Sequence, residues 1–254
     1  MPDEHHTTIS CPDLAADVQA MWEVLSHGGV VICPAAGGYT IAGPGTKEGG
    51  ARINEIKGRP AHKRLGLMMG NRGEREVHIL DDTKRAMITC ITETYNLPIH
   101  VIARFRADHP LIQQLDADAL KLCTANGTIT SGVNMGGFFL NAVNARAEEG
   151  TLFPVFASSC NASGAGPKAR VEDIEPEVLA AADLVIDYGP QDGYSSTTST
   201  QFNFDTMQLV RWGRAFDSIA WVMKRHFGID LPPDPGREVS PGGHVDEFAL
   251  VDAD

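Results

Sequence analysis

The chain has 254 residues, of which 43% are hydrophobic and 21% charged, and this length is enough for one domain with a sizeable core. Its formal net charge of −12 argues against a nonspecific nucleic-acid binder, and no run approaches the roughly 18 consecutive apolar residues of a membrane span. The five cysteines are scattered and no pair has zinc-ligand spacing, which is typical of reduced thiols. We therefore expect a cytoplasmic protein without direct contact to nucleic acid or membrane. The sequence leaves open whether it forms a homodimer.

Composition divides the chain into three segments. Residues 1–11 are acidic and polar, unlike a secretory signal, and we expect them to be disordered. Residues 12–227 carry strand patterns that alternate with helix patterns, which predicts one α/β domain. Residues 228–254 are rich in proline, glycine and acidic residues, and we expect a C-terminal tail that can drape over the surface.

The first half of the chain begins with a clear amphipathic helix. Apolar residues recur at helical spacing after Asp13, and the pair at 28–29 is Gly-Gly, which ends helices. A short buried strand at 30–33 then breaks into small residues and glycines at 34–39, where a ligand could approach the backbone or the chain could simply turn. The pattern further predicts helices at 45–55, 81–94 and 109–115, and strands at 65–69 and 99–105.

The second half predicts a mixed sheet. Residues 127–137 are rich in glycine and small polar residues, and an apolar run that starts at Phe153 predicts a central buried strand. Two late strands are close enough to form a hairpin, so the sheet is not purely parallel. The predicted elements are helices at 138–149, 171–182 and 214–227, and strands at 184–187, 198–204 and 208–212.

The stretch FPVFASSCNASG at 153–164 is the most informative one. Its apolar run stops abruptly at small polar residues, among them Ser159, Asn161 and Ser163. A buried strand with this pattern delivers hydroxyls and an amide into a pocket at its C-terminal end. Cys160, in the middle, fits a small packed thiol better than a nucleophile.

Basic residues gather shortly after the second predicted helix. Such a run is usually a solvated face, but here it coincides with Gly-Arg-Pro at 58–60 in a chain short of positive charge. The coincidence favours an anion site, and small hydroxyl and amide donors near it would suit a phosphate-bearing ligand. The basic residues are Lys57, Arg59, Lys63, Arg64, Arg72 and Arg75.

Five short motifs, in this order along residues 12–214, resemble the YrdC-like family of threonylcarbamoyl-AMP synthases. Each motif alone is weak, but the shared order and approximate spacing are specific. The motifs are Lys57-x-Arg59-Pro60 followed by Lys63, Ser159-Cys160-Asn161-Ala162-Ser163-Gly164, Ile186-Asp187-Tyr188-Gly189, Ser196-Thr197, and Arg211-Trp212-Gly213.

The resemblance implies a twisted mixed α/β sheet with flanking helices around a large concave pocket. It also implies a nucleotidyltransferase of tRNA modification that uses ATP, bicarbonate and L-threonine as small-molecule substrates, with Mg²⁺ carried by the nucleotide and no protein metal site. In that reaction the amine captures bicarbonate as a carbamate, whose oxygen attacks the α-phosphate and expels pyrophosphate. Such a displacement needs positive charge around the phosphates more than a protein nucleophile.

The resemblance also implies roles for particular residues. Lys57 and Arg59 would be the catalytic groups that neutralise the phosphates. The nucleotide would be bound by Lys63, Ser159, Asn161, Ser196 and Arg211. The substrate would contact Tyr39, which takes the place of a family tyrosine, and Ser163. From its position in the strand after the turn at 96–98, we expect His100 to point into the same pocket and to contact the substrate as well.

The chain departs from the family pattern on the amino-acid side. The segment at 34–40 lacks the hydroxyls and the carboxylate of the family turn, and 132–135 lacks the family arginine. We therefore expect a divergent synthase that makes a carbamoyl-adenylate from an amino acid or other amine, with bicarbonate or another carbamoyl donor. The alternative is a non-catalytic or repurposed small-ligand-binding protein, such as a hydrolase or lyase, on the same fold.

Overall fold

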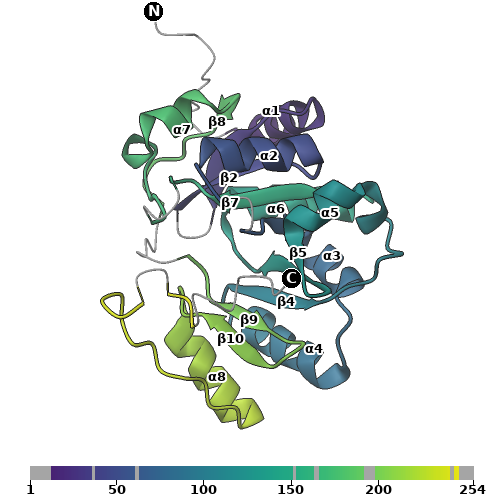
Figure 1. Ribbon diagram of the computed structural model, residues 1–254, viewed down its shortest axis with the longest axis vertical. Helices are drawn as coiled ribbons and strands as arrows, with labels where there is room; N and C mark the ends of the chain where they lie inside the picture. Colours follow the sequence, from purple (N-terminus) through teal and green to yellow (C-terminus); the bar gives the residue numbers. More distant parts are fainter. Residues whose placement is uncertain are drawn as a thin grey trace, which may run out of the picture.

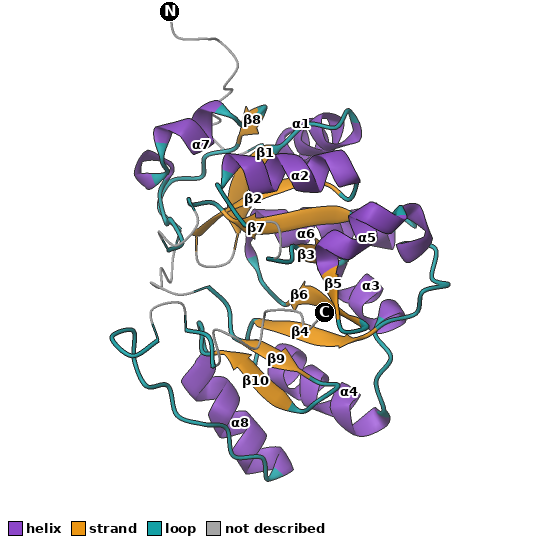
Figure 2. Ribbon diagram, in the orientation of Figure 1, coloured by secondary structure: helices purple, strands orange, loops and turns teal. Residues whose placement is uncertain are grey.

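The computed structural model describes residues 13–35, 38–60, 63–150, 153–162, 166–191, 198–240 and 243–245. Two mixed sheets, each flanked by helices, lie one above the other in the view of Figure 1 and Figure 2. The α/β class and the mixed strand directions predicted from the sequence are confirmed, with two sheets in place of one. No helix in the described ranges is long and apolar enough to span a membrane.

The upper sheet has the strand order β3-β7-β2-β1-β8. All of its pairings are antiparallel except that between β1 and β8, which is parallel. The strands are β1 (Val31–Ala35), β2 (Gly38–Pro44), β3 (Gly66–Met68), β7 (Val155–Ser159) and β8 (Leu184–Val185).

Helices cover both faces of the upper sheet, which is why β1 and β2 are nearly continuous runs of buried residues. On one face, α1 (Leu14–Ser26) and α6 (Gly137–Glu148) pack their apolar residues against Val31 and Cys33. On the other face, the core around Ile41 and Phe156 is closed by three helices. These are α2 (Lys47–Ile56), α5 (Ala117–Cys123) and α7 (Pro176–Ala180).

The lower sheet has the strand order β10-β9-β4-β6-β5. β4 pairs with β9 in parallel, and the other pairings are antiparallel. Contacts between β3 and β6 join the two sheets. The strands are β4 (Ile99–Arg104), β5 (Thr124–Ala125), β6 (Thr128–Val133), β9 (Gln201–Asn203) and β10 (Gln208–Arg211).

One face of the lower sheet carries its own apolar core. Residues of α4 (Asp82–Thr89), of the following π-helical turn (Cys90–Thr94) and of α8 (Phe216–Phe227) pack there against Val101 and Phe202. The remaining helix, α3 (Gly70–Val77), follows β3 and packs beside α6.

Two predicted helices are wrong. The segment 109–115 holds only a short 3₁₀ turn, Ile112–Gln114, because Asp116 caps a new helix immediately afterwards. The segment 171–182 is split into a 3₁₀ turn, Val171–Asp173, and α7. Pro176 explains the split, because proline favours an extended residue before it, and Glu175 has ψ 132°.

Five elements of the described chain lie where the pattern predicts none, namely β2, α3, α5, β5 and β6. β6 lies within the glycine-rich stretch 127–137, and α3 begins at a glycine with φ +69°. The predicted hairpin of the two late strands is confirmed, because β9 and β10 pair antiparallel. The predicted helix at 81–94 is also present, although its last turn widens into a π-helix.

The chain after α8 runs back along β10. Gly228 ends α8 in the left-handed conformation, and the indole of Trp212 donates to the carbonyl of Pro232 at 2.9 Å. The backbone N–H of Trp212 donates to Gly243 at 2.7 Å, and that of Val245 donates to Val210 at 3.0 Å. Residues 1–11 and 246–254 lie outside the described ranges, so the predicted segment boundaries remain predictions.

Candidate functional site

Lys57 links the end of α2 to the end of β7. Lys57 is buried, with only 4% of the residue exposed. Its ammonium donates to the backbone carbonyls of Ser159 and of Asn161, the latter at 2.5 Å. Burial lowers the pKa of Lys57 to about 8, and the neighbouring charges of Arg59 and Lys63 act in the same direction. Two motifs that lie about a hundred residues apart in the sequence are thereby joined by one side chain.

Arg59 lies beside the same strand end. One of its terminal nitrogens donates to Ser158 Oγ at 3.0 Å, and the other donates to the carbonyl of Arg64. Its Nε is buried and has no partner among the described residues. Burial lowers the pKa of the guanidinium, which means that removal from water destabilises its charged form.

The polar residues after β7 meet these cations. Asn161 is 5% exposed, and its Nδ2 donates to the carbonyl of Ala162 at 2.5 Å. Its Oδ1 is buried without a partner in the described part of the chain, so one acceptor is left over for a ligand. Ser159 is half-buried and contributes its carbonyl to Lys57. The predicted site residues Ser163 and Ser196 lie outside the described residues.

Arg211 approaches the same region from the lower sheet. It projects from β10 and donates to the carbonyl of Ser199 from Nε at 3.1 Å and from Nη2 at 2.7 Å. Burial lowers the pKa of Arg211 to about 9, and the charges of Arg59 and Arg237 lower it further. Arg59 follows α2 of the upper sheet, so the electrostatic repulsion with Arg211 acts between the two sheets.

The segment after α8 adds two residues to the group. His244 pairs with Arg211 in an antiparallel bridge, and its Nδ1 is buried without a described partner. Burial lowers the pKa of His244 to about 4, and the positive charges of Arg211, Lys63, Arg237 and Arg59 reinforce the shift. Sequence reasoning missed His244 and Arg237, because their surroundings have the composition of a tail and carry no motif.

These cations, Lys57, Arg59, Lys63, Arg211 and Arg237, are called the basic cluster below. Of these five cations, only Arg237 forms an ion pair with another described residue, Asp234, at 2.6 Å. The other four form none within the described ranges. This is unusual in a chain of net charge −12, where Arg52, Arg85 and Arg104, for example, all pair with carboxylates. Like charges held together without counter-charges favour the binding of an anion.

His100 lies in register with Arg211, two strands away in the lower sheet. Both residues pair with Gln201 of β9, which lies between β4 and β10. Burial lowers the pKa of His100 to about 3, with a further contribution from the charge of Arg211. The imidazole is therefore neutral at pH 7, and its Nδ1 has no partner in the described ranges.

Tyr39 already has a structural role. Its hydroxyl lies 2.8 Å from Asp187 Oδ1 and 2.8 Å from the carbonyl of Gly189, and it accepts from the backbone N–H of Tyr188 at 3.1 Å. Burial raises the pKa of this phenol, and the hydrogen bond to the Asp187 carboxylate raises it further. The phenol thus holds the turn after β8, and a contact to substrate remains a prediction.

Nucleophilic and metal chemistry find little support in the described residues. Cys160 is fully buried, and burial raises the pKa of its thiol to about 12, so it is protonated at neutral pH. Within the ranges that the structure describes, no group of three His, Cys, Asp or Glu residues could hold a metal ion.

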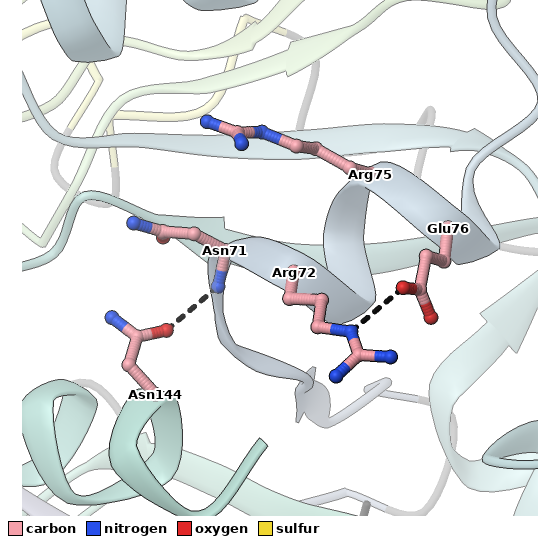
Figure 3. Close-up of a pocket in the computed structure, with 5 residues that line it drawn as sticks. All are labelled: Asn71, Arg72, Arg75, Glu76 and Asn144. Carbon is pink, nitrogen blue, oxygen red and sulfur yellow. Dashed lines mark hydrogen bonds and ion pairs between the residues drawn. The ribbon is translucent and has the colours of Figure 1, made fainter. Parts of the chain in front are cut away.

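Two cavities lie elsewhere, around α3. The larger, of about 430 Å³, is lined by Asn71, Arg72, Arg75, Glu76 and Asn144 (Figure 3). A smaller one of about 100 Å³ adjoins it and shares Asn71 and Arg75. Neither is lined by a residue predicted for the nucleotide or substrate site, so the large concave pocket remains a prediction.

Solved structures with the same fold include three informative ones. Sua5 of P. abyssi complexed with L-threonine is 18% identical, with a TM-score of 0.64 over 90% of this chain and 63% of that chain. E. coli YciO is 21% identical, with a TM-score of 0.60 over 82% of this chain and 94% of that chain. HypF in a phosphate- and nucleotide-bound form is 15% identical, with a TM-score of 0.60 over 81% of this chain and 25% of that chain.

The chain thus spans less than two thirds of the length of Sua5, and about the whole length of YciO. No curated protein matches the sequence. A sequence profile of the Sua5/YciO/YrdC family, described as telomere recombination, matches residues 23–213. Since that match covers most of the chain, and the fold agrees, this protein belongs to the Sua5/YciO/YrdC family.

Proposed function

We propose that the chain is an adenylate-forming enzyme that converts an amino acid or another amine into a carbamoyl-adenylate, with ATP and with bicarbonate or another carbamoyl donor. The basic cluster is the observation that supports this most. Arg59 and Lys63 lie in one segment after α2, Arg211 lies on β10, and none of the three has an ion pair among the described residues. A triphosphate would supply the missing negative charge.

The chemistry asks little of the protein beyond this charge. The amine condenses with bicarbonate to a carbamate, with loss of water. A carbamate oxygen then attacks the α-phosphorus of ATP, the bond from that phosphorus to the β-phosphate oxygen breaks, and pyrophosphate leaves. Charge accumulates on the phosphate oxygens in this step, and fixed cations stabilise it without reorganisation. Arg59 and Arg211 are the fixed cations in this proposal, and Lys63, which is exposed, assists them.

The remaining predicted residues bind and position. Lys57 keeps β7 and its polar end next to Arg59, while the unpartnered Oδ1 of Asn161 accepts a hydrogen bond from the nucleotide. Ser159 and Ser196 would contribute hydroxyls, the latter from outside the described residues. Mg²⁺ prefers oxygen ligands, and the described part of this site offers no carboxylate cluster. The ion would therefore be held by the phosphate oxygens, and no step above depends on it.

The acceptor is an amine that differs from threonine in this proposal. His100, as a neutral imidazole, would line its site together with Ser163, while the Tyr39 hydroxyl holds the turn after β8 beside it. The segments at 34–40 and 132–135 lack groups that hold the amino acid in the family pattern, which supports a changed acceptor. The complex of the structural neighbour Sua5 with L-threonine, and the nucleotide-bound form of HypF, support small-molecule and nucleotide substrates for this fold.

Calorimetry and pyrophosphate release test the proposal together. Magnesium-ATP is titrated into the protein, and pyrophosphate is then measured with bicarbonate and a panel of amino acids and amines that includes L-threonine. Saturable ATP binding, with pyrophosphate release that requires one amine, supports the synthase. ATP binding without release for any amine leaves the non-catalytic alternative, and no ATP binding refutes the assignment of the basic cluster to a triphosphate.

A further inference from the structure

The cavity beside α3 is separate from the basic cluster. β3 leads into α3, and Met68 at its end pairs with Val155 at the start of β7. Lys57 contacts the other end of β7, at Ser159. The cavity of about 430 Å³ therefore lies toward the opposite end of this strand, between α3 and Asn144 of α6.

Backbone N–H groups fix the two amide side chains of this cavity. The N–H of Asn71 donates to Asn144 Oδ1 at 2.7 Å, and the N–H of Asn134 donates to Asn71 Oδ1 at 3.4 Å. Both amide oxygens are therefore used, and both NH₂ groups are turned away, toward the side where the Arg75 guanidinium lies (Figure 3). Gly70 permits this approach, since a side chain there would come within 2.7 Å of Asn144 Oδ1.

The acceptors of the one carboxylate in the lining are also used. Glu76 Oε1 accepts from Arg72 Nε at 2.8 Å, and Oε2 lies 3.2 Å from His109 Nε2. The N–H of Leu111 donates to His109 Nδ1, which leaves the proton on Nε2 and makes His109 a donor to Glu76. Each of these side-chain oxygens thus already accepts one hydrogen bond.

Donors remain on four side chains. The NH₂ groups of Asn71 and Asn144 have no hydrogen-bond partner in the described chain. Arg72 uses only Nε and Nη1, and Arg75 uses only Nη2, toward Glu93. The Arg75–Glu93 pair is about half exposed on both sides, so solvent screens it and an incoming anion can compete. The part of the lining formed by the two NH₂ groups and Arg75 thus offers free donors, which favour a ligand that presents acceptors.

We propose that this cavity is a second binding site, for a small molecule that bears a carboxylate or a phosphate. The two amides and the Arg75 guanidinium would donate to its oxygens, in the way that arginine sites recognise oxyanions, while Arg72 stays paired with Glu76 on the other side (Figure 3). The volume leaves room for an organic body beyond the anionic group itself. The proposal does not depend on the adenylation chemistry, because the two sites share no residue.

The site can be tested by NMR on the full ¹⁵N-labelled chain. Inorganic phosphate and succinate are titrated in turn, with sodium chloride at matched ionic strength as the reference. The side-chain NH₂ signals of Asn144 are assigned by their loss in Asn144→Asp. We expect these signals and the Arg75 side-chain Nε–H signal to shift saturably with phosphate, succinate or both. The titrant that binds with the lower dissociation constant identifies the preferred oxyanion.

Asn144→Asp is also the decisive variant. It keeps an oxygen for the Asn71 N–H but replaces the free donor by a negative charge, so affinity should fall by at least about tenfold, judged from the backbone signals of α3. Asn203→Asp is the matched control, because its Oδ1 likewise accepts backbone N–H groups, from Asp205 at 2.9 Å and Thr206 at 3.1 Å. If Asn144→Asp does not fold, the exposed Arg75→Gln replaces it, with the same expected weakening.

Three results would overturn the proposal. The first is a set of shifts equal to those caused by chloride, which indicates ionic strength alone. The second is unchanged affinity in Asn144→Asp or Arg75→Gln. The third is phosphate binding that perturbs only signals near Arg59 and Arg211, since the basic cluster can also bind phosphate.

Discussion

The ammonium of Lys57 lies 2.5 Å from the carbonyl oxygen of Asn161, which makes a buried cation the link between the end of α2 and the loop after β7. The carbonyl of Ser159 accepts from the same nitrogen. The two stretches that carry the best-matched motifs are therefore coupled directly, and a change at one of them should be felt at the other.

Replacing Lys57 by methionine should destabilise the polar end of β7. The buried carbonyls of Ser159 and Asn161 would lose their donor, which costs about 1–3 kcal/mol, partly offset because no buried charge remains. Urea unfolding measures this, and calorimetry should show weakened ATP binding. Full ATP affinity in Lys57→Met would show that the link is structural only.

The pH dependence of the same variant gives an independent check. The pKa of Lys57 falls from 10.5 to about 8 on folding, so the unfolded chain binds more protons between these values. The wild type should therefore gain stability relative to Lys57→Met as the pH rises from about 8 toward 10.5, and the difference should be constant below about pH 7. A difference that does not change with pH would contradict the lowered pKa.

Arg211→Gln should separate stability from binding. Burial and the charges of Arg59 and Arg237 disfavour the Arg211 cation, which offsets the loss of its two hydrogen bonds to the Ser199 carbonyl, so its removal should leave the melting temperature of the ligand-free protein nearly unchanged. ATP affinity should fall by about tenfold or more, since a charge-assisted contact to phosphate is lost. Scanning calorimetry in phosphate-free buffer and ATP titration measure the two effects.

Arg104→Gln is the control for this experiment. Arg104 lies on β4 in the same sheet and forms an exposed ion pair with Asp205 at 2.6 Å. Its replacement should leave ATP affinity unchanged and stability within about 1 kcal/mol. If both variants reduce ATP affinity equally, a general loss of positive charge explains the result and the specific role of Arg211 is wrong.

The sequence predicts the parts of this protein that depend on local pattern. The helix at the start of the chain, the central strand and the late hairpin are marked by apolar spacing and by glycines, and all three are confirmed. β6 is missed because glycine and small polar residues hide the alternation of apolar and polar positions. In the sheet it lies between β4 and β5, and most of its residues are buried. α7 is shorter than predicted because Pro176 interrupts the acidic first turn.

The candidate site shows the same division. Lys57, Arg59 and Arg211 can be found because they stand in motifs. Ser158, which accepts a hydrogen bond from Arg59, precedes the predicted Ser159. The pairing of β7 with β2 would be needed to choose between the two serines. His244 cannot be predicted in this way, because only the return of the chain along β10 brings it to Arg211, and no local pattern encodes that contact.

Acid sensitivity should depend on His100. Its pKa is about 3 in the folded protein against 6.5 for a free imidazole, so the unfolded state binds an extra proton between these values. Stability should therefore fall as the pH drops from about 6.5 toward 3. In His100→Phe this part of the loss should be absent, which urea unfolding at pH 7, 5.5 and 4 can measure; parallel curves for both proteins would contradict the shift.

Tyr39→Phe distinguishes a structural phenol from a substrate contact. The phenol bonds Asp187 and accepts from the N–H of Tyr188, so its removal leaves buried polar groups unpaired and should destabilise the fold by about 1–3 kcal/mol. ATP affinity and the KM for the accepted amine should change little, because the hydroxyl is already engaged. Urea unfolding and steady-state kinetics give the two readouts. A raised KM for the amine without loss of stability would reverse the assignment and make Tyr39 a substrate-binding residue, as the sequence pattern predicts.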